Sequence, residues 1–328
     1  MGSPDFLRTH AETPLCERYT VGGLVCSLAT NSERLLAAAR ESFPPLKGPS
    51  SPADLALRFW VDDDDAARPP WPKPYVRGLD ELVFVGLDSR SSVLADLRKR
   101  RIIGRISPAL AGDSRYWRTV VFPILFSIVA GSIGLVELHA SCVARDQKGV
   151  ILVGPSRSGK STLAMAFVEA GFRLLSDDRV FASVQRDGLL AFGLSRPLKL
   201  RRDAVSWFQQ ARAVKHMDRQ GEESVYYIES KEPATQQTSP PCEPRAVLFL
   251  ERQEAPGFRA IPMDHADARH CIEMDVMAEA PRAIKSQERV IDALLTLPCW
   301  RLQYGGTRPQ VIAEQILRSL LEPAAFGR

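Results

Sequence analysis

The sequence lacks the features that mark several classes of protein. Its six cysteines are scattered without a CxxC spacing, which favours free thiols in a reducing cytosol and leaves one disulfide pair open. The 43 Lys and Arg nearly balance the 39 Asp and Glu, and a net charge of +4 does not argue for nucleic acid. A hydrophobic content of 45% with 25% charged residues excludes disorder, collagen and coiled coil for the whole chain. We therefore expect a globular, cytoplasmic protein with no nucleic-acid partner.

Long hydrophobic runs are also scarce. Residues 1–5 carry neither the basic nor the apolar region of a signal peptide. One uncharged segment, 120–136, has 17 residues, which is the bottom of the range for a membrane span. It also contains Pro123, Gly131 and Gly134. We expect a helix buried under a sheet here, and no membrane partner.

The chain divides into two regions of different pattern. At roughly 150 residues per domain, 328 residues suggest two domains. The first third is rich in strand-like segments and has a proline-rich stretch at 66–74, whereas strands and helices alternate from Trp117 onward. We expect a β-rich α+β domain over 1–117 and an α/β domain over 118–328.

Two charge runs stand in the first region. The acidic run is Asp62–Asp65 and the basic run is Arg98–Arg101. Four consecutive carboxylates do not converge on one cation without a special loop, so the acidic run is interpreted as a solvated loop. The basic run is more often a solvated face, and the alternative left open is contact with a phosphate or an acidic partner.

The strongest motif follows an apolar strand at 150–153. Residues 154–161 fit G-x-x-x-x-G-K-[ST], and a helix is predicted to begin directly after them. Glycines let backbone N–H groups turn around an anion, and the helix start adds a positive dipole end. Lys160 adds a full charge, and the Ser161 hydroxyl can ligate Mg²⁺. The predicted nucleotide-binding residues are Gly154, Pro155, Ser156, Arg157, Ser158, Gly159, Lys160, Ser161 and Thr162.

Two carboxylates and a histidine accompany this loop. Asp177 and Asp178 end the strand that follows the loop's helix, and ligands sit at the carboxyl ends of strands in parallel sheets. Successive strand residues point to opposite faces, so the two carboxylates are expected to divide the work of metal ligand and proton acceptor. An Asp-Asp turn that merely ends the strand is the alternative. His139 lies in an apolar strand before the loop, where a core role is the alternative.

These motifs together resemble a known family. The segments Leu138-His139-Ala140, 149–161 and 171–179 match, in order and spacing, the C-terminal domain of HPr kinase/phosphorylase. The similarity is close over roughly 135–185. It implies a PEP-carboxykinase-like P-loop kinase core that uses ATP and Mg²⁺ to phosphorylate a serine.

The resemblance also implies roles for individual residues. Asp177 would be the catalytic acid/base, Asp178 would support it and contact Mg²⁺ with Ser161, and Lys160 and His139 would lie by the phosphates. The family's E-[IV]-R-G motif has no clear equivalent here. Arg196 is therefore a candidate for contact with a phosphate, and Glu251 is a candidate for a second carboxylate on the metal side. For both residues, the alternative is an ion pair on the surface.

Three functions follow from these patterns. The leading one is a kinase acting on a serine of a protein or ribosomal peptide, with the first domain as a candidate surface for recognising the acceptor. A small-molecule kinase and a regulatory module that binds ATP without turnover are the alternatives. The acceptor, a homo-oligomeric state and the choice of ATP or GTP are left open by the sequence.

Overall fold

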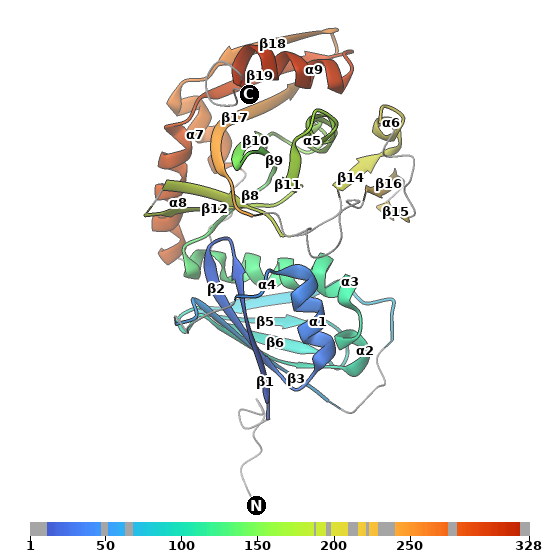
Figure 1. Cartoon of the computed structure of the whole chain (residues 1–328), viewed down its shortest axis with the longest axis vertical. Helices are drawn as coiled ribbons and strands as arrows, with labels where there is room; N and C mark the ends of the chain where they lie inside the picture. Colours follow the sequence, from blue (N-terminus) through green and yellow to red (C-terminus); the bar gives the residue numbers. More distant parts are fainter. Residues whose placement is uncertain are drawn as a thin grey trace, which may run out of the picture. The chain divides into compact units, whose positions relative to one another are not determined.

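A computed structural model describes most of the chain. The described residues are 12–46, 52–62, 68–186, 188–194, 198–208, 216–220, 223–228, 240–274 and 281–321. They form two compact units, Met1–Ile133 and Gly134–Arg328. Each has its own sheets and its own helices (Figure 1). The chain is therefore a mixed α/β protein with both parallel and antiparallel strand pairs.

Unit 1 is built on one seven-stranded sheet with the order β1-β2-β3-β7-β6-β5-β4. The first two strands form the hairpin predicted at Gly22-Gly23, whose φ angles of 59° and 84° favour glycine. Helix α1, Glu33–Ser42, joins two parallel strands and ends before Pro44. The strands are β1 Leu15–Val21, β2 Leu24–Thr30, β3 Leu55–Val61, β4 Tyr75–Leu79, β5 Leu82–Gly86, β6 Ser92–Asp96 and β7 Arg101–Ile106.

The apolar segment considered as a membrane span belongs to unit 1. The segment is helical over Ser114–Ile133 and includes α3 Ser114–Tyr116 and α4 Phe122–Val129. It follows the short helix α2 Pro108–Ala111. By length and composition it could cross a membrane, and half of it is buried within the structure. The Phe43 ring after α1 lies 4.9 Å from the Phe122 ring in an edge-on contact. Because this packing holds the segment in unit 1, the units divide at Ile133/Gly134 instead of the expected 117/118.

Unit 2 is a layered structure around a six-stranded sheet with the order β11-β9-β10-β17-β19-β18. Helices α5 and α9 pack with one face of the sheet, whereas α7 and α8 pack with the other (Figure 1). The strands are β9 Ala140–Arg145, β10 Lys148–Val153, β11 Arg173–Ser176, β17 Glu243–Arg252, β18 Gly257–Pro262 and β19 Cys299–Gly305; the helices are α5 Lys160–Glu169, α7 His265–Glu273, α8 Pro281–Leu295 and α9 Pro309–Ile316.

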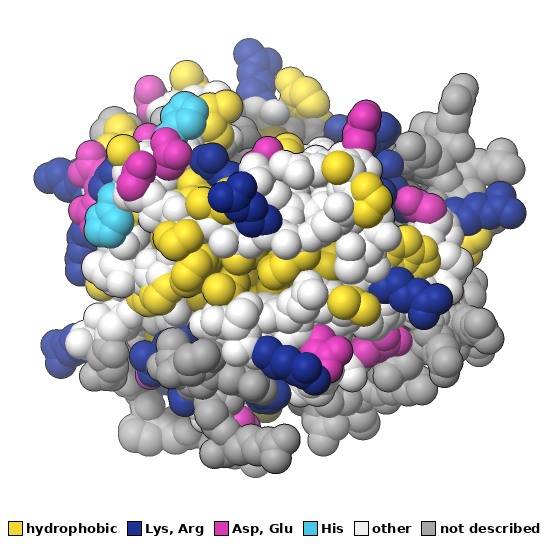
Figure 2. All heavy atoms as spheres, turned by 90° about the horizontal axis from the view of Figure 1, so that it is seen from above, with side chains coloured by type: hydrophobic (Ala, Val, Ile, Leu, Met, Phe, Trp, Pro, Cys, Tyr) yellow, Lys and Arg dark blue, Asp and Glu magenta, His cyan; other side chains and the backbone are white. Residues whose placement is uncertain are grey.

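Two smaller sheets complete unit 2. One has the order β13-β12-β8, and the other has the order β14-β16-β15. Their strands are β8 Val136–Leu138, β12 Val180–Gln185, β13 Gly188–Phe192, β14 Leu198–Arg201, β15 His216–Gln220 and β16 Glu223–Ile228, and helix α6 spans Arg202–Val205. On the face seen in Figure 2, hydrophobic side chains form a band, and side chains of both charges are interspersed around it.

Candidate functional site

The candidate site lies where two strands pass together from one sheet to another. Strand β8 pairs with β12 in the small sheet, and β9 pairs with β11 in the large sheet. His139 is the residue between β8 and β9, and Asp177 and Asp178 lie between β11 and β12. The sequence suggested one continuous strand through His139, but the chain changes sheets at this residue. Because the hydrogen-bonded pairing is interrupted here, His139, Asp177 and Asp178 lie at the edge of the large sheet where β10 ends.

The predicted phosphate-binding loop leads from β10 into α5. Gly154 and Gly159 have φ angles of 153° and 97°, which side-chain-bearing residues rarely adopt. A Cβ on Gly159 would lie 2.5 Å from the Tyr304 hydroxyl, and a Cβ on Gly154 would lie 2.8 Å from Ser158 Oγ. Both glycines are therefore required by the backbone and by close packing. The Tyr304 hydroxyl donates to the Ser158 carbonyl and ties the loop to β19.

Lys160 begins α5 and turns back over the loop. Its side chain is almost completely buried, and its ammonium donates to the carbonyls of Gly154 and Pro155 at 2.5 and 3.3 Å. Ser158, inside the same loop, has a buried hydroxyl without a hydrogen-bond partner. An unpaired buried polar atom is costly. The loop therefore holds polar groups that a bound anion can satisfy.

Asp177 joins the loop to the end of β11. Its Oδ1 accepts hydrogen bonds from Ser161 Oγ at 2.9 Å and Ser141 Oγ at 2.6 Å, and its Oδ2 accepts from the Lys199 backbone N–H at 3.3 Å. The residue is only 3% exposed. Burial raises the pKa of this carboxyl above its usual value, and the three hydrogen bonds oppose that shift. Asp177 is thus locked against the hydroxyl predicted to ligate Mg²⁺.

Asp178 points to a different environment. Its backbone has a φ of 71°, and its carboxylate lies 3.2 Å from His139 Nε2. Both side chains are nearly half exposed. Next to this pair, Arg179 and Glu137 form an ion pair at 2.9 Å between the same two chain segments. The two adjacent carboxylates therefore face different partners, although they lie after the last residue of β11 and not within a strand.

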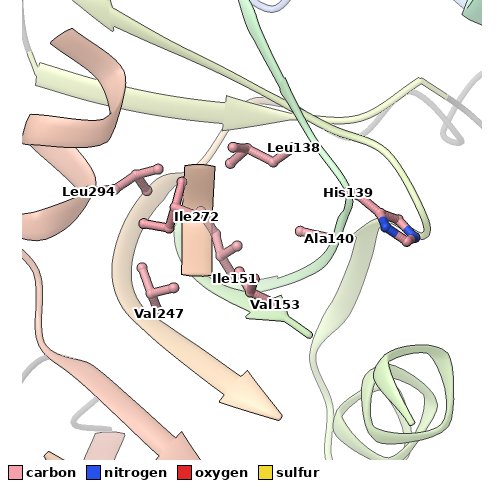
Figure 3. A pocket seen from close by; sticks show the side chains of 8 residues that line it. All are labelled: Leu138, His139, Ala140, Ile151, Val153, Val247, Ile272 and Leu294. Atoms are coloured by element: carbon pink, nitrogen blue, oxygen red, sulfur yellow. The ribbon is translucent and has the colours of Figure 1, made fainter. Parts of the chain in front are cut away.

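A small cavity lies on the other side of His139. It is lined by aliphatic side chains around Leu138 and Ile151, and the His139 ring projects away from them (Figure 3). The space open to a water-sized sphere is about 10 Å³. An apolar space of this size stays dry. This cavity is a gap in the core, and the polar side of the site is where His139 meets Asp178.

Two further residues were predicted to belong to the site, Glu251 and Arg196. The Glu251 carboxylate, at the end of β17, contacts Gln303 at 3.2 Å and Arg301 at 4.0 Å, both on β19. Its metal role therefore stays a prediction. Arg196 lies outside the described residues. Within the described ranges no three His, Cys, Asp or Glu side chains form a metal-holding cluster. Mg²⁺ in phosphoryl-transfer sites needs only one or two carboxylates besides a hydroxyl, waters and phosphates.

Three contributors to the site were missed from the sequence. Ser141 and the Lys199 backbone bond to Asp177, and Tyr304 packs on the loop from a strand far along the chain. Ser141 follows His139 by two residues, so it lies at the same end of β9, and this spacing was an available signal. Lys199 and Tyr304 approach only through tertiary packing, and no local pattern identifies them.

Comparison with known proteins adds little to this description. No family model matches the chain, and no curated protein matches it. The chain is similar to the solved structure of the Hpr(Ser) kinase/phosphatase from Coxiella burnetii, with 14% identity and a TM-score of 0.29. The match covers 56% of this chain and 93% of that one. A likeness of this extent carries no functional inference. Any inference about function must therefore be supported by the residues of the site.

Proposed function

We propose that this chain is an ATP-dependent kinase that phosphorylates a serine hydroxyl of a protein or peptide. The observation that carries the proposal is the contact of Ser161 with Asp177. It joins a phosphate-binding loop to a carboxylate pair whose second member faces a histidine. Loop, metal-side carboxylate and a separate proton acceptor are the parts that phosphoryl transfer requires.

The nucleotide phosphates would be held by the loop. Backbone N–H groups of 156–161, at the start of α5, favour an anion there. The Lys160 ammonium would exchange its bonds to the Gly154 and Pro155 carbonyls for phosphate oxygens. The unpaired Ser158 hydroxyl can donate to the same anion.

The donor set beside the loop fits Mg²⁺. The Ser161 hydroxyl and the Asp177 carboxylate are hard oxygen ligands, and they already lie within 2.9 Å of each other. When bound, the ion would offset the negative charge that develops on the transferred phosphoryl group. Ser141 and the Lys199 N–H fix Asp177 in place, so the ligands would need little rearrangement.

The contacts support a division of labour opposite to the one implied by the family resemblance. That resemblance gave the base role to Asp177 and the supporting role to Asp178. We assign Asp177 to the metal side because it is buried and engaged with Ser161. We assign the proton to Asp178, which is accessible and contacts His139. As the serine oxygen bonds to the γ-phosphorus and the bond to the leaving ADP oxygen breaks, Asp178 accepts the hydroxyl proton.

The test uses γ-labelled ATP with Mg²⁺ and a lysate of the source organism. Acid-stable label on a polypeptide serine is the expected result, and Lys160→Ala is the blank. Label on a small metabolite would instead establish a small-molecule kinase. Bound ATP without any transfer would leave a regulatory module and overturn the kinase proposal.

A second comparison separates the two aspartates. Asp178→Asn is expected to lower the transfer rate by about 10²–10⁴-fold and to leave the affinity for Mg-ATP unchanged. Asp177→Asn is expected to weaken the Mg²⁺ dependence of ATP binding. If Asp177→Asn binds Mg-ATP normally and only transfer fails, the assignment returns to Asp177 as the base.

A further inference from the structure

The hairpin formed by β4 and β5 exposes an unusual amount of apolar surface. Nine large hydrophobic side chains are exposed among the described residues, and five of them belong to this hairpin. Contiguous apolar surface of this kind marks interaction sites. The five side chains are Tyr75, Val76, Leu79, Leu82 and Phe84, and all of them except Val76 lie on the same face of the sheet.

Strand β4 is also the end of its sheet. It is the last strand in the order of the seven-stranded sheet, and β5 is its only strand partner among the described residues. All five of its residues are exposed. Natural edge strands are blunted by proline, lysine, bulges or covering loops. Within β4 there is neither proline nor lysine, and its pairing with β5 has an unbroken register, so none of the described strands occupies its second backbone edge.

The pairing register places basic groups beside this apolar surface. Leu79 pairs with Leu82, which pairs with Asp96, which in turn pairs with Arg101. These four residues therefore form one row across one face of the sheet. In the next row on that face, Arg77 pairs with Phe84. Along β4 this face therefore carries Leu79, Arg77 and Tyr75, which are apolar, basic and apolar in turn.

The basic run of the sequence lies at the same end of the sheet. The Leu97 N–H donates to the Glu81 carbonyl at 2.8 Å, which holds the β6–β7 turn against the β4–β5 turn. Arg98–Arg101 follow directly and are exposed. Three carboxylates are nearby, those of Asp80, Glu81 and Asp96, and Asp96 is within 3.9 Å of Lys99. With Arg77, the basic groups outnumber the acidic ones, so the surface favours an acidic partner.

We propose that β4, β5 and the basic run form a docking surface for an extended peptide segment in which every second residue, and therefore one face of the strand, is acidic and apolar in turn. The segment adds to the sheet as a strand beside β4, and its backbone bonds to the open edge. Because every second residue of a strand points to the same face, the apolar side chains on that face of the segment lie beside Leu79 and Tyr75, and its carboxylates lie beside Arg77 and the basic run. This binding belongs to unit 1 and does not depend on phosphoryl transfer.

The probe is a fluorescein-labelled peptide in which every second residue is glutamate and valine in turn and the residues between them are serine, titrated with the full chain and followed by anisotropy. Leu79→Glu and Arg77→Glu are each expected to weaken binding by about tenfold or more. Met274→Glu is the matched control for the first, because both side chains belong to residues that are 74% exposed. Arg318→Glu, whose side chain is also highly exposed, is the control for the second. Lys160→Ala is expected to bind the peptide normally, which separates this proposal from the kinase proposal.

Peptide variants test the mode of binding. A peptide with lysine in place of glutamate, and one with N-methyl groups on alternate amides, are both expected to bind much more weakly. Equal binding by either peptide, or no effect of Leu79→Glu in a variant whose circular dichroism and melting match the wild type, overturns the proposal. An oligonucleotide that displaces the peptide and binds more tightly would indicate a nucleic-acid surface. A dimer that Leu79→Glu dissociates and the peptide cannot displace would assign the surface to a second copy of this chain.

Discussion

Ser161 Oγ lies 2.9 Å from Asp177 Oδ1, so the first turn of α5 is tied to the end of β11 by a single hydrogen bond. The two residues are 16 positions apart in sequence, and the tertiary structure brings them into contact. The bond also explains why Asp177 tolerates burial, since its Oδ1 accepts two hydroxyl donors.

Removing the Ser161 hydroxyl tests this bond. Ser161→Ala is expected to weaken Mg-ATP binding by about tenfold or more, because a metal ligand is lost. Binding of ATP without Mg²⁺ should change little. Isothermal titration with and without Mg²⁺ measures both, and the exposed Ser319→Ala is the control. An equal loss under both conditions would contradict a metal role for Ser161.

Lys160 is expected to be essential for nucleotide binding. Lys160→Ala removes the buried ammonium that now bonds to two loop carbonyls, and with it the full charge beside the phosphates. We expect a loss of at least about tenfold in ATP affinity, with the metal present. Lys285→Ala, an exposed lysine on α8, provides the comparison. Wild-type affinity in Lys160→Ala would remove the loop from the proposed site.

Acid titration should reveal the buried state of Asp177. Because burial raises its pKa above the ordinary 3.8, the folded chain holds this proton more tightly than the unfolded chain does. The contribution to stability is fully present below pH 3.8 and is lost as the pH rises through the raised pKa. Urea unfolding over a pH series measures it. Asp177→Asn should lack this contribution, and an identical pH dependence in both proteins would contradict it.

The close packing of Cys242 against β10 leaves no room for a side chain at Gly149. A Cβ there would lie 2.4 Å from Cys242 Sγ, and that sulfur is 3.9 Å from Cys142 Sγ. Gly149→Ala is expected to reduce the free energy of unfolding by about 1–3 kcal/mol through overpacking. Adding Cys242→Ala should recover most of the loss in urea unfolding. Gly86→Ala, where the nearest atom to the new Cβ is at an ordinary 3.7 Å, is the control.

We expect Tyr304 to stabilise the loop without contacting the reacting groups. Tyr304→Phe removes the hydrogen bond to the Ser158 carbonyl and is expected to cost about 0.5–1.5 kcal/mol of stability. ATP affinity should fall while the transfer rate at saturating ATP is retained. A selective loss of that rate would instead place Tyr304 among the reacting groups.

Several elements of the fold could be read from local sequence. The Gly22-Gly23 hairpin and the strand, loop and helix around Gly154 appear where the pattern predicts them, because glycine conformations and apolar periodicity act within a few residues. His139 was predicted inside one strand and instead lies between two. Pairing partners decide where a strand changes sheets, and these partners lie tens of residues away in β11 and β12.

The domain boundary shows the same limit. The segment 118–133 was expected to begin the second domain because its pattern resembles an α/β helix. Its aromatic side chains pack with Phe43, and this contact places it in unit 1. Hydrophobic burial is not directional along the chain, so an apolar helix packs wherever a complementary face is available.

The sequence by itself determined the strand, loop and helix around the predicted phosphate-binding loop, because glycine spacing and apolar periodicity are local properties. It also determined that two carboxylates would lie near the loop, since the ends of β10 and β11 meet at one edge of a sheet. Only the tertiary structure decided which carboxylate contacts Ser161 and which contacts His139. That choice depends on burial and on donors supplied by Ser141 and Lys199, which distant strands bring to Asp177.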